Sequence, residues 1–155
     1  MHAGFAAGNG EAMKELRIEA SLDNLDEVLR FVDQELEGAD CPVKFMMQID
    51  LAVEEIFVNI ASYAYAPGKG DAVIRLEIAG NPRYAEICFI DSGVPYDPLK
   101  KKDPDVTLSA AEREIGGLGI YMAKKSVDDV RYEYRDGKNV LTIKKNHSQA
   151  ESTHE

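Results

Sequence analysis

Positive charge is scarce in this sequence of 155 residues, which has 18 lysines and arginines against 28 aspartates and glutamates and a formal charge of -10. The phosphate backbone of a nucleic acid would be repelled unless the basic residues gathered in one patch, so no nucleic-acid partner is expected. Cysteine is scarcer still, with Cys41 and Cys88 alone. Cys88 lies in the apolar run AEICFID, which predicts a buried free thiol and favours a reducing cytoplasm.

Long apolar runs are missing as well. None reaches the roughly 18 residues of a membrane span, and the first residues have no basic segment followed by a long apolar one. Neither a membrane location nor secretion is expected. Hydrophobic residues make up 45% of the chain, which suits one domain with a substantial core. The Gly-rich start and the polar end predict flexible segments at 1–12 and 146–155 around a domain at 13–145.

Hydrophobic periodicity predicts helices and strands throughout that domain. The expected elements are a strand at 14–20, a helix at 24–38, a long apolar helix at about 43–65, strands at 72–80 and 83–91, a helix at 118–127 and a hairpin at 128–145. The hairpin turns at Asp136-Gly137, which places Val130 opposite Ile143 and Tyr132 opposite Leu141 on one apolar face. This order predicts an α+β two-layer sandwich with the helices on one sheet face.

The long helix carries two polar residues, Glu55 and Asn59, four positions apart and therefore on one face. Buried carboxylates and amides are costly unless a partner satisfies them. Asn59 offers an oxygen that Mg²⁺ accepts, and Glu55 can deprotonate a hydroxyl or position a water at a γ-phosphate. The alternative is structural, with both side chains capping or bridging the backbone at the sheet edge. Glu54 points about 100° away and is expected to be solvated.

The segment DSGVPYDP follows the second strand of the predicted 72–91 pair. Asp91 can accept a hydrogen bond from the exocyclic amine of adenine and would repel the oxygen that guanine has there. Gly93 has no side chain, so a flat ring can come close. The alternative is an ordinary Asp-x-Gly turn.

Glycines also cluster in IGGLGIYMAKK, where Gly117 and Gly119 stand before the predicted helix. Free N–H groups at a helix start, with the positive end of the dipole, attract anions such as phosphate. A dinucleotide-binding fingerprint is rejected because Met122 stands where the third glycine belongs and no strand precedes the motif.

A loop of more than twenty residues separates these two motifs. Loops of this length in compact domains are usually functional or disordered. Ser109-x-x-Glu112 fits a capping box that starts a short helix. The functional alternative is a lid that brings side chains to phosphates when nucleotide binds, from among Lys100, Lys101, Lys102, Thr107 and Ser109.

Taken together in this order, EEIFVNIASYAY, DSGVPYDP and GGLGI resemble the N, G1 and G2 boxes of the Bergerat-fold ATPases, the group of gyrase, MutL and the histidine-kinase catalytic domains. More narrowly, the sequence from about 16 to 145 resembles the bacterial anti-sigma-factor serine kinases. The resemblance implies a Bergerat sandwich with a mixed sheet, helices on one face and a long ATP lid. A histidine kinase needs a phosphoacceptor histidine on a dimerisation helix. It is disfavoured because His2, His147 and His154 all lie near the ends of the chain.

The resemblance also implies roles for individual residues. Asn59 would take Mg²⁺, and Glu55 would be the base toward a serine hydroxyl. The remaining nucleotide contacts would come from Tyr63, Asp91, Gly93, Gly117, Leu118 and Gly119. The chain departs from the family pattern at Tyr63, where histidine is common, and at Lys138-Asn139, where Gly-Thr is common. Tyr63 can line the adenine pocket, and Asn139 can replace the hydrogen bond of the threonine.

The function expected from the resemblance is a cytoplasmic protein serine/threonine kinase that depends on ATP and Mg²⁺. It would phosphorylate a small antagonist protein, the anti-anti-sigma factor, and in its other state sequester a sigma factor. Both partners would act in trans, and a homodimer is expected. The alternative is an ATP-gated protein-interaction module without significant phosphotransfer, and a third possibility is a small domain with no nucleotide site.

Overall fold

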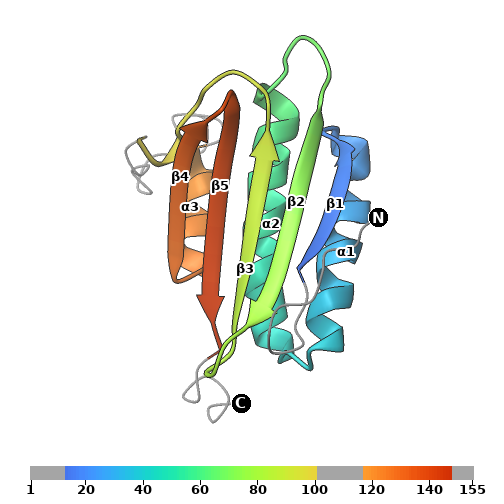
Figure 1. The fold of residues 1–155 in the computed structure, drawn as a ribbon, viewed down its shortest axis with the longest axis vertical. Helices are drawn as coiled ribbons and strands as arrows, with labels where there is room; N and C mark the ends of the chain where they lie inside the picture. Colours follow the sequence, from blue (N-terminus) through green and yellow to red (C-terminus); the bar gives the residue numbers. More distant parts are fainter. Residues whose placement is uncertain (1–12, 101–116, 148–155) are drawn as a thin grey trace.

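Five strands and three α-helices make up the described part of the chain, residues 13–100 and 117–147 of the computed structural model (Figure 1). In chain order they are β1 (Lys14–Glu19), α1 (Leu25–Gly38), α2 (Val43–Tyr63), β2 (Asp71–Ala79), β3 (Tyr84–Asp91), α3 (Gly117–Ser126), β4 (Asp129–Arg135) and β5 (Lys138–Asn146). The predicted order of elements is therefore confirmed, with bounds that differ by one or two residues. The predicted domain limits at 13 and 145 stay predictions.

The strands form one sheet in the order β1-β2-β3-β5-β4, and every neighbouring pair is antiparallel. The expected α+β sandwich is confirmed, but the sheet is antiparallel rather than mixed. Two helices, α1 and α2, connect β1 to β2. The chain therefore runs along the sheet twice between these strands, and β2 runs antiparallel to β1. The helix between β3 and β4 makes those two strands parallel, but β5 lies between them and is antiparallel to both.

The hairpin of β4 and β5 has the predicted register. Val130 pairs with Ile143, and Tyr132 pairs with Leu141. Both turn residues, Asp136 at φ 55° and Gly137 at φ 77°, adopt left-handed conformations. Such turns match the twist of the two strands, which explains why an Asp-Gly dipeptide closes this hairpin.

All three helices cover one face of the sheet, and Figure 1 shows them behind the strands. The core fills the space between these two layers, where α2 packs between α1 and α3. The apolar stripe of α1 faces this core, since Val28, Val32 and Leu36 are fully buried. The other side chains buried to 99% or more include Phe45, Ile49, Ile56 and Phe57 from α2 and Ile74, Leu76, Ile87, Phe89 and Ile143 from the sheet.

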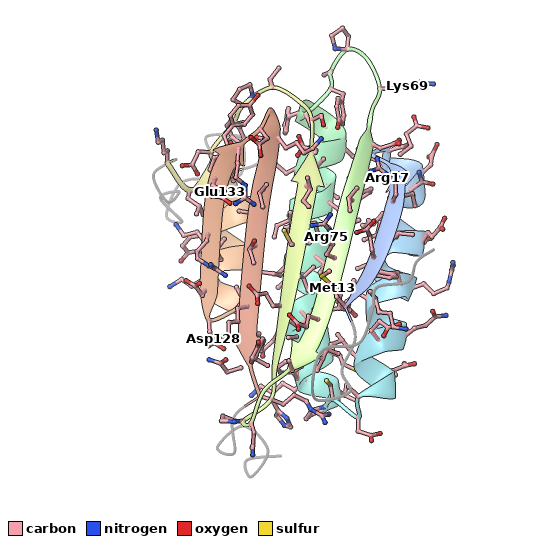
Figure 2. All side chains as sticks on the ribbon, in the orientation of Figure 1. Met13, Arg17, Lys69, Arg75, Asp128 and Glu133 are labelled. Atoms are coloured by element: carbon pink, nitrogen blue, oxygen red, sulfur yellow. The ribbon has the colours of Figure 1, made fainter. Side chains whose placement is uncertain are left out.

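The opposite face of the sheet carries none of the described helices and is rich in charge (Figure 2). Arg75 of β2 contacts Glu15 of β1 at 2.9 Å between Nε and Oε1. Arg131 of β4 contacts Glu86 of β3, also at 2.9 Å. Antiparallel sheets commonly bury one face and hydrate the other, and strand alternation produces that division here.

Cys88 also lies on this open face because its neighbours on β3 point into the core. Its thiol is free, as predicted, but only half-buried, so the predicted burial is wrong in degree. Partial burial raises the pKa of Cys88 and keeps the thiol protonated at neutral pH.

Among the described helices, none has the length and apolar character needed to span a membrane.

Candidate functional site

A cavity of about 330 Å³ lies between the C-terminal half of α2, the end of β3 and the start of β5. Three of the predicted nucleotide residues line it, namely Asn59, Tyr63 and Asp91. Apolar walls come from Ile56, Ile60, Val94, Pro95 and Leu141. A mostly apolar cavity with a few polar groups is the usual form of a small-molecule site.

Asp91 stands at the end of β3 and is only 6% exposed. Its Oδ1 accepts two hydrogen bonds, from the Gly93 backbone N–H and from the Asn139 side-chain amide, both at 2.9 Å. Among the described residues, no hydrogen bond reaches the other oxygen, Oδ2. Because Asp91 lines a mostly apolar cavity and its Oδ2 keeps its acceptor capacity, Oδ2 is the place where a ligand amine would be bound most favourably.

Gly93 fixes the loop after β3 against the end of α2. A Cβ at this position would lie 2.2 Å from the backbone oxygen of Ala64, which no side chain tolerates. The next residue, Val94, donates its backbone N–H to the same oxygen at 3.0 Å. The turn predicted as the alternative does form, with the Gly93 N–H on Asp91, and that turn is part of the cavity wall.

Asn139 is a site residue, although in the sequence it stood out only as a departure from the family pattern. It is 7% exposed, lines the cavity and pairs with Asp91 across β3 and β5. Its Nδ2 donates to the Asp91 carboxylate and to the Val94 carbonyl, each at 2.9 Å, while its Oδ1 accepts from the Tyr96 N–H at 3.1 Å and from the Tyr132 hydroxyl. The signal in the sequence was a polar residue at an inward position of a strand.

Glu55 and Asn59 lie one turn apart on α2, and only Asn59 is among the described residues that line the cavity. Both side chains are half-buried, and neither makes a hydrogen bond or an ion pair to another described residue, so the structural alternative of backbone capping is not seen there. Asn59 lines the cavity, whereas Glu55 lies one turn farther away and is absent from the described lining. Burial, reinforced by the nearby charge of Glu54, raises the pKa of Glu55. Glu54 is exposed, as expected.

Gly117 and Gly119 lie in the first turn of α3 rather than before the helix. A helix leaves its first backbone N–H groups unpaired wherever its glycines fall, so the argument for an anion site holds for this turn. Leu118 lies between them. The predicted lid residues from Lys101 to Ser109 lie outside the described residues, and Lys100 ends a short 3-10 turn, Pro98–Lys100.

Tyr65 connects the site to the rest of the fold and was not predicted. Its hydroxyl donates to the Asp71 carbonyl at 2.6 Å and accepts the Ser92 backbone N–H at 2.7 Å. It thereby links the start of β2 to the loop that follows β3. Tyr65 stands two residues after Tyr63, and nothing in the sequence distinguishes the role of one tyrosine from that of the other.

The described residues contain no group of three His, Cys, Asp or Glu side chains that could hold a metal by themselves. Mg²⁺ usually keeps several waters and takes only one or two protein ligands plus substrate phosphates, so a nucleotide-bound Mg²⁺ would need one protein oxygen at the cavity. Asn59 is the described residue on the cavity wall that fits this role.

Residues 18–145 match the family described as histidine kinase-like ATPase domain. The serine/threonine-protein kinase BtrW of Bordetella bronchiseptica is 32% identical over 104 residues, which cover 67% of this chain and 72% of BtrW. The serine-protein kinase RsbW of Listeria monocytogenes is 30% identical over 100 residues, and the match spans 62% of this chain and 63% of that kinase, less than two thirds of its length.

A solved structure, that of the RsbU and RsbW domains of Rv1364c from Mycobacterium tuberculosis, has the same fold. It superposes on 85% of this chain and 32% of its own with a TM-score of 0.60, at 19% sequence identity. The fold and the family match agree with the resemblance that the three sequence boxes indicated, and the described cavity lining contains residues of the first two boxes. The chain therefore belongs to the histidine kinase-like ATPase family, in which its relatives include bacterial serine and serine/threonine protein kinases.

Proposed function

We propose that this protein is an ATP- and Mg²⁺-dependent serine/threonine kinase that acts as an anti-sigma regulatory factor. The carrying observation is the buried carboxylate of Asp91, whose Oδ2 has no donor among the described residues and which lines the cavity. The names of the relatives, serine and serine/threonine protein kinases, support the reaction class.

The cavity favours adenine over guanine. The exocyclic amine of adenine donates to Asp91 Oδ2, whereas the carbonyl of guanine would place an acceptor against an acceptor. The aliphatic side chains of Ile60 and Val94 provide apolar walls for a flat base. The volume of about 330 Å³ lies at the lower end of the range for small-molecule sites, which suits a base and part of a sugar.

Phosphates would extend from the base toward the first turn of α3, which offers unpaired N–H groups at Gly117 and Gly119. Asn59 would hold Mg²⁺, which neutralises charge on the phosphates. Glu55 would accept the proton of a serine hydroxyl while the serine oxygen attacks the γ-phosphorus and ADP leaves. Burial first, and then the charge of Glu54, raise the pKa of Glu55, which makes it a stronger base than an ordinary glutamate.

The proposed partners follow from the resemblance to anti-sigma-factor serine kinases. The substrate would be a small anti-anti-sigma antagonist protein, and the sequestered protein a sigma factor, both acting in trans in the cytoplasm. The protein would work as a homodimer.

A second candidate function is an ATP-gated interaction module without significant phosphotransfer. The position of Glu55 favours it, because this side chain does not reach the described cavity lining. Glu55→Ala distinguishes the two candidates. Loss of phosphotransfer with unchanged nucleotide binding in this variant supports the kinase. A wild type that binds nucleotide but transfers no phosphate supports the module.

The test is a thermal melt with ADP, ATP and GTP, each with and without Mg²⁺. At a nucleotide concentration of about 100 times Kd, the wild type should melt about 5–10 °C higher with adenine nucleotides. Asp91→Asn retains an oxygen for the Gly93 and Asn139 bonds but turns a donor toward the amine, so the shift should vanish. Asn59→Ala should remove the Mg²⁺ dependence.

Asp136→Asn is the matched control for Asp91→Asn, because Asp136 lies in an exposed turn where asparagine is equally suited. It should keep the full shift. A wild type whose melting temperature is unchanged by any nucleotide would refute both the kinase and the module.

A further inference from the structure

The N-terminal end of α2 lacks the acceptors that usually stand at the start of a helix. Its N-cap is Pro42, which offers no side-chain acceptor, and its first turn contains no acidic residue. Among the described residues, none accepts the backbone N–H of Val43, Lys44 or Phe45, whereas the N–H of Met46 reaches the Pro42 carbonyl at 3.0 Å. Unpaired N–H groups and the positive end of the helix dipole together attract anions.

A buried lysine, Lys145, faces the same end of α2. It follows Ile143 at the next inward position of β5 and is only 7% exposed. Its Nζ lies 5.8 Å from the ring centre of Phe45, which belongs to the first turn of α2. With the described residues it forms no hydrogen bond and no ion pair. Burial of an ammonium group is costly unless the charge is paired and hydrogen-bonded, and a ring face alone supplies neither.

Two further basic residues, His147 and Arg83, lie at this end. The ring centres of His147 and Phe45 are 5.7 Å apart, and the His147 backbone N–H donates to the Arg83 carbonyl at 2.8 Å. The Arg83 guanidinium donates to the carbonyl of Ala39 in the loop before α2. Although the chain as a whole has a formal charge of -10, basic groups therefore gather around the start of this helix.

The acids of this region do not compensate Lys145. Asp40, in the loop before α2, is exposed. Asp128 is also exposed, and its Oδ2 accepts the Asn146 backbone N–H at 2.6 Å. Neither carboxylate forms an ion pair with Lys145, so the positive charge at this end has no counter-charge among the described residues.

We propose that the N-terminal end of α2 binds an oxyanion of the phosphate class, held between the first-turn N–H groups and the Lys145 ammonium. A phosphate group carries close to two negative charges and at least three acceptor oxygens, so it can accept from several N–H donors while it balances the charge of Lys145. A carboxylate has a single charge and would satisfy fewer of these donors. Free phosphate and a small phosphate ester offer the same group to the site.

This anion site is separate from the nucleotide cavity. The 21 residues of α2 span about 30 Å, and the cavity lies along the C-terminal half of the helix. Figure 1 shows the start of α2 and the end of β5 at the lower edge of the sheet, and the end of β3, which lines the cavity, at the upper edge. The inference therefore goes beyond the proposed kinase function and does not depend on it.

The test is an amide NMR titration of the full chain with inorganic phosphate, and in a second arm with glycerol 2-phosphate. Sodium chloride keeps the ionic strength constant. The amide signals of Val43, Lys44 and Phe45 should move with one common Kd. Tighter binding in the first arm assigns the free ion to the site, and tighter binding in the second arm assigns an esterified phosphate.

Lys145→Met removes the charge but keeps an apolar chain of similar length against Phe45, so the core stays filled. The loss of a charged hydrogen-bond donor should raise the Kd for phosphate at least about tenfold. Lys144→Met is the matched control, because the same change at the next residue affects an ammonium on the open face, 4.3 Å from the ring centre of Tyr84. It should leave the Kd unchanged.

Thermal melts provide a second measurement. At about ten times Kd, phosphate should raise the melting temperature of the wild type by about 3–6 °C over sodium chloride of equal ionic strength. Asp91→Asn should keep this shift while it loses the shift with adenine nucleotides, so the anion site and the nucleotide proposal can fail separately. First-turn amides that do not respond to phosphate up to about 20 mM would overturn the anion site. Lys145→Met that binds phosphate as the wild type does, or Lys144→Met that weakens binding equally, would overturn it as well.

Discussion

Asp50 offers the sharpest test of how the two main helices are joined. Its carboxyl group on α2 interacts with that of Asp33 on α1, and a hydrogen bond between the two is one cause of the raised pKa of Asp50. Two carboxylates only accept hydrogen bonds, so this contact needs a proton between them. Each residue also has a buried oxygen, Oδ1, without a hydrogen-bond partner in the described structure. The pKa of Asp50 is raised to about 7. Burial is the largest cause, followed by the interaction with Asp33 and then by the charge of Glu54.

The sign of the pH effect on stability follows from the linkage between proton binding and folding. Between the unfolded pKa of 3.8 and the folded value of about 7, the folded state binds more protons, so this pair loses stability as pH rises through that window. The full shift corresponds to about 4 kcal/mol, at about 1.4 kcal/mol per pH unit. Because Asp50 is only half-buried, solvent screening reduces this, and about 2 kcal/mol is the expected penalty above pH 7.

Asp50→Asn should remove that penalty, because its amide donates to Asp33 without a shared proton. Urea unfolding at pH 4 should show little difference from the wild type, and at pH 8 the variant should be about 2 kcal/mol more stable. Asp136→Asn, in the exposed turn, should show no such change between the two pH values. A stability difference that is constant with pH, or a variant less stable at pH 8, would refute the shared proton.

Two further predictions concern the site. Gly93→Ala should cost about 2–4 kcal/mol in urea unfolding and abolish the thermal shift with ADP, because its Cβ would lie 2.2 Å from the Ala64 oxygen and force the loop away; unchanged unfolding would contradict this close approach. Asn139→Ala should cost about 2–4 kcal/mol, since it leaves buried groups on Asp91, Val94 and Tyr96 without partners. Asn146→Ala, on the exposed end of β5, is its control and should cost under about 1 kcal/mol in the same assay.

Periodicity predicted the order of elements because each helix and strand buries one regular face. The turn at Asp136-Gly137 even predicted the register of β4 and β5, since a two-residue loop allows one pairing. The antiparallel order of the whole sheet was not predicted. It depends on β5 inserting between β3 and β4, a contact between strands far apart in sequence that no local pattern encodes.

The site was predicted where function needs a polar residue in apolar surroundings. Asp91 and Asn59 stand out because an acid or an amide interrupts an otherwise buried face. Tyr65 was missed because its role depends on contacts made only in the folded chain, whereas Asn139, a polar residue at an inward strand position, was considered only as a departure from the family pattern. Tyr65 acts through backbone groups at Asp71 and Ser92, which carry no sequence signal at all.

Asn139 also explains how the cavity leaves one oxygen for a ligand. A threonine hydroxyl can donate one hydrogen bond, whereas the Asn139 amide donates to both Asp91 and Val94 and accepts from Tyr96 and Tyr132. The chain thus satisfies Asp91 Oδ1 and the surrounding backbone by itself. Base selection then depends on Oδ2 alone, which makes the isosteric change Asp91→Asn, rather than any change in cavity size, the perturbation that should abolish the thermal shift with adenine nucleotides.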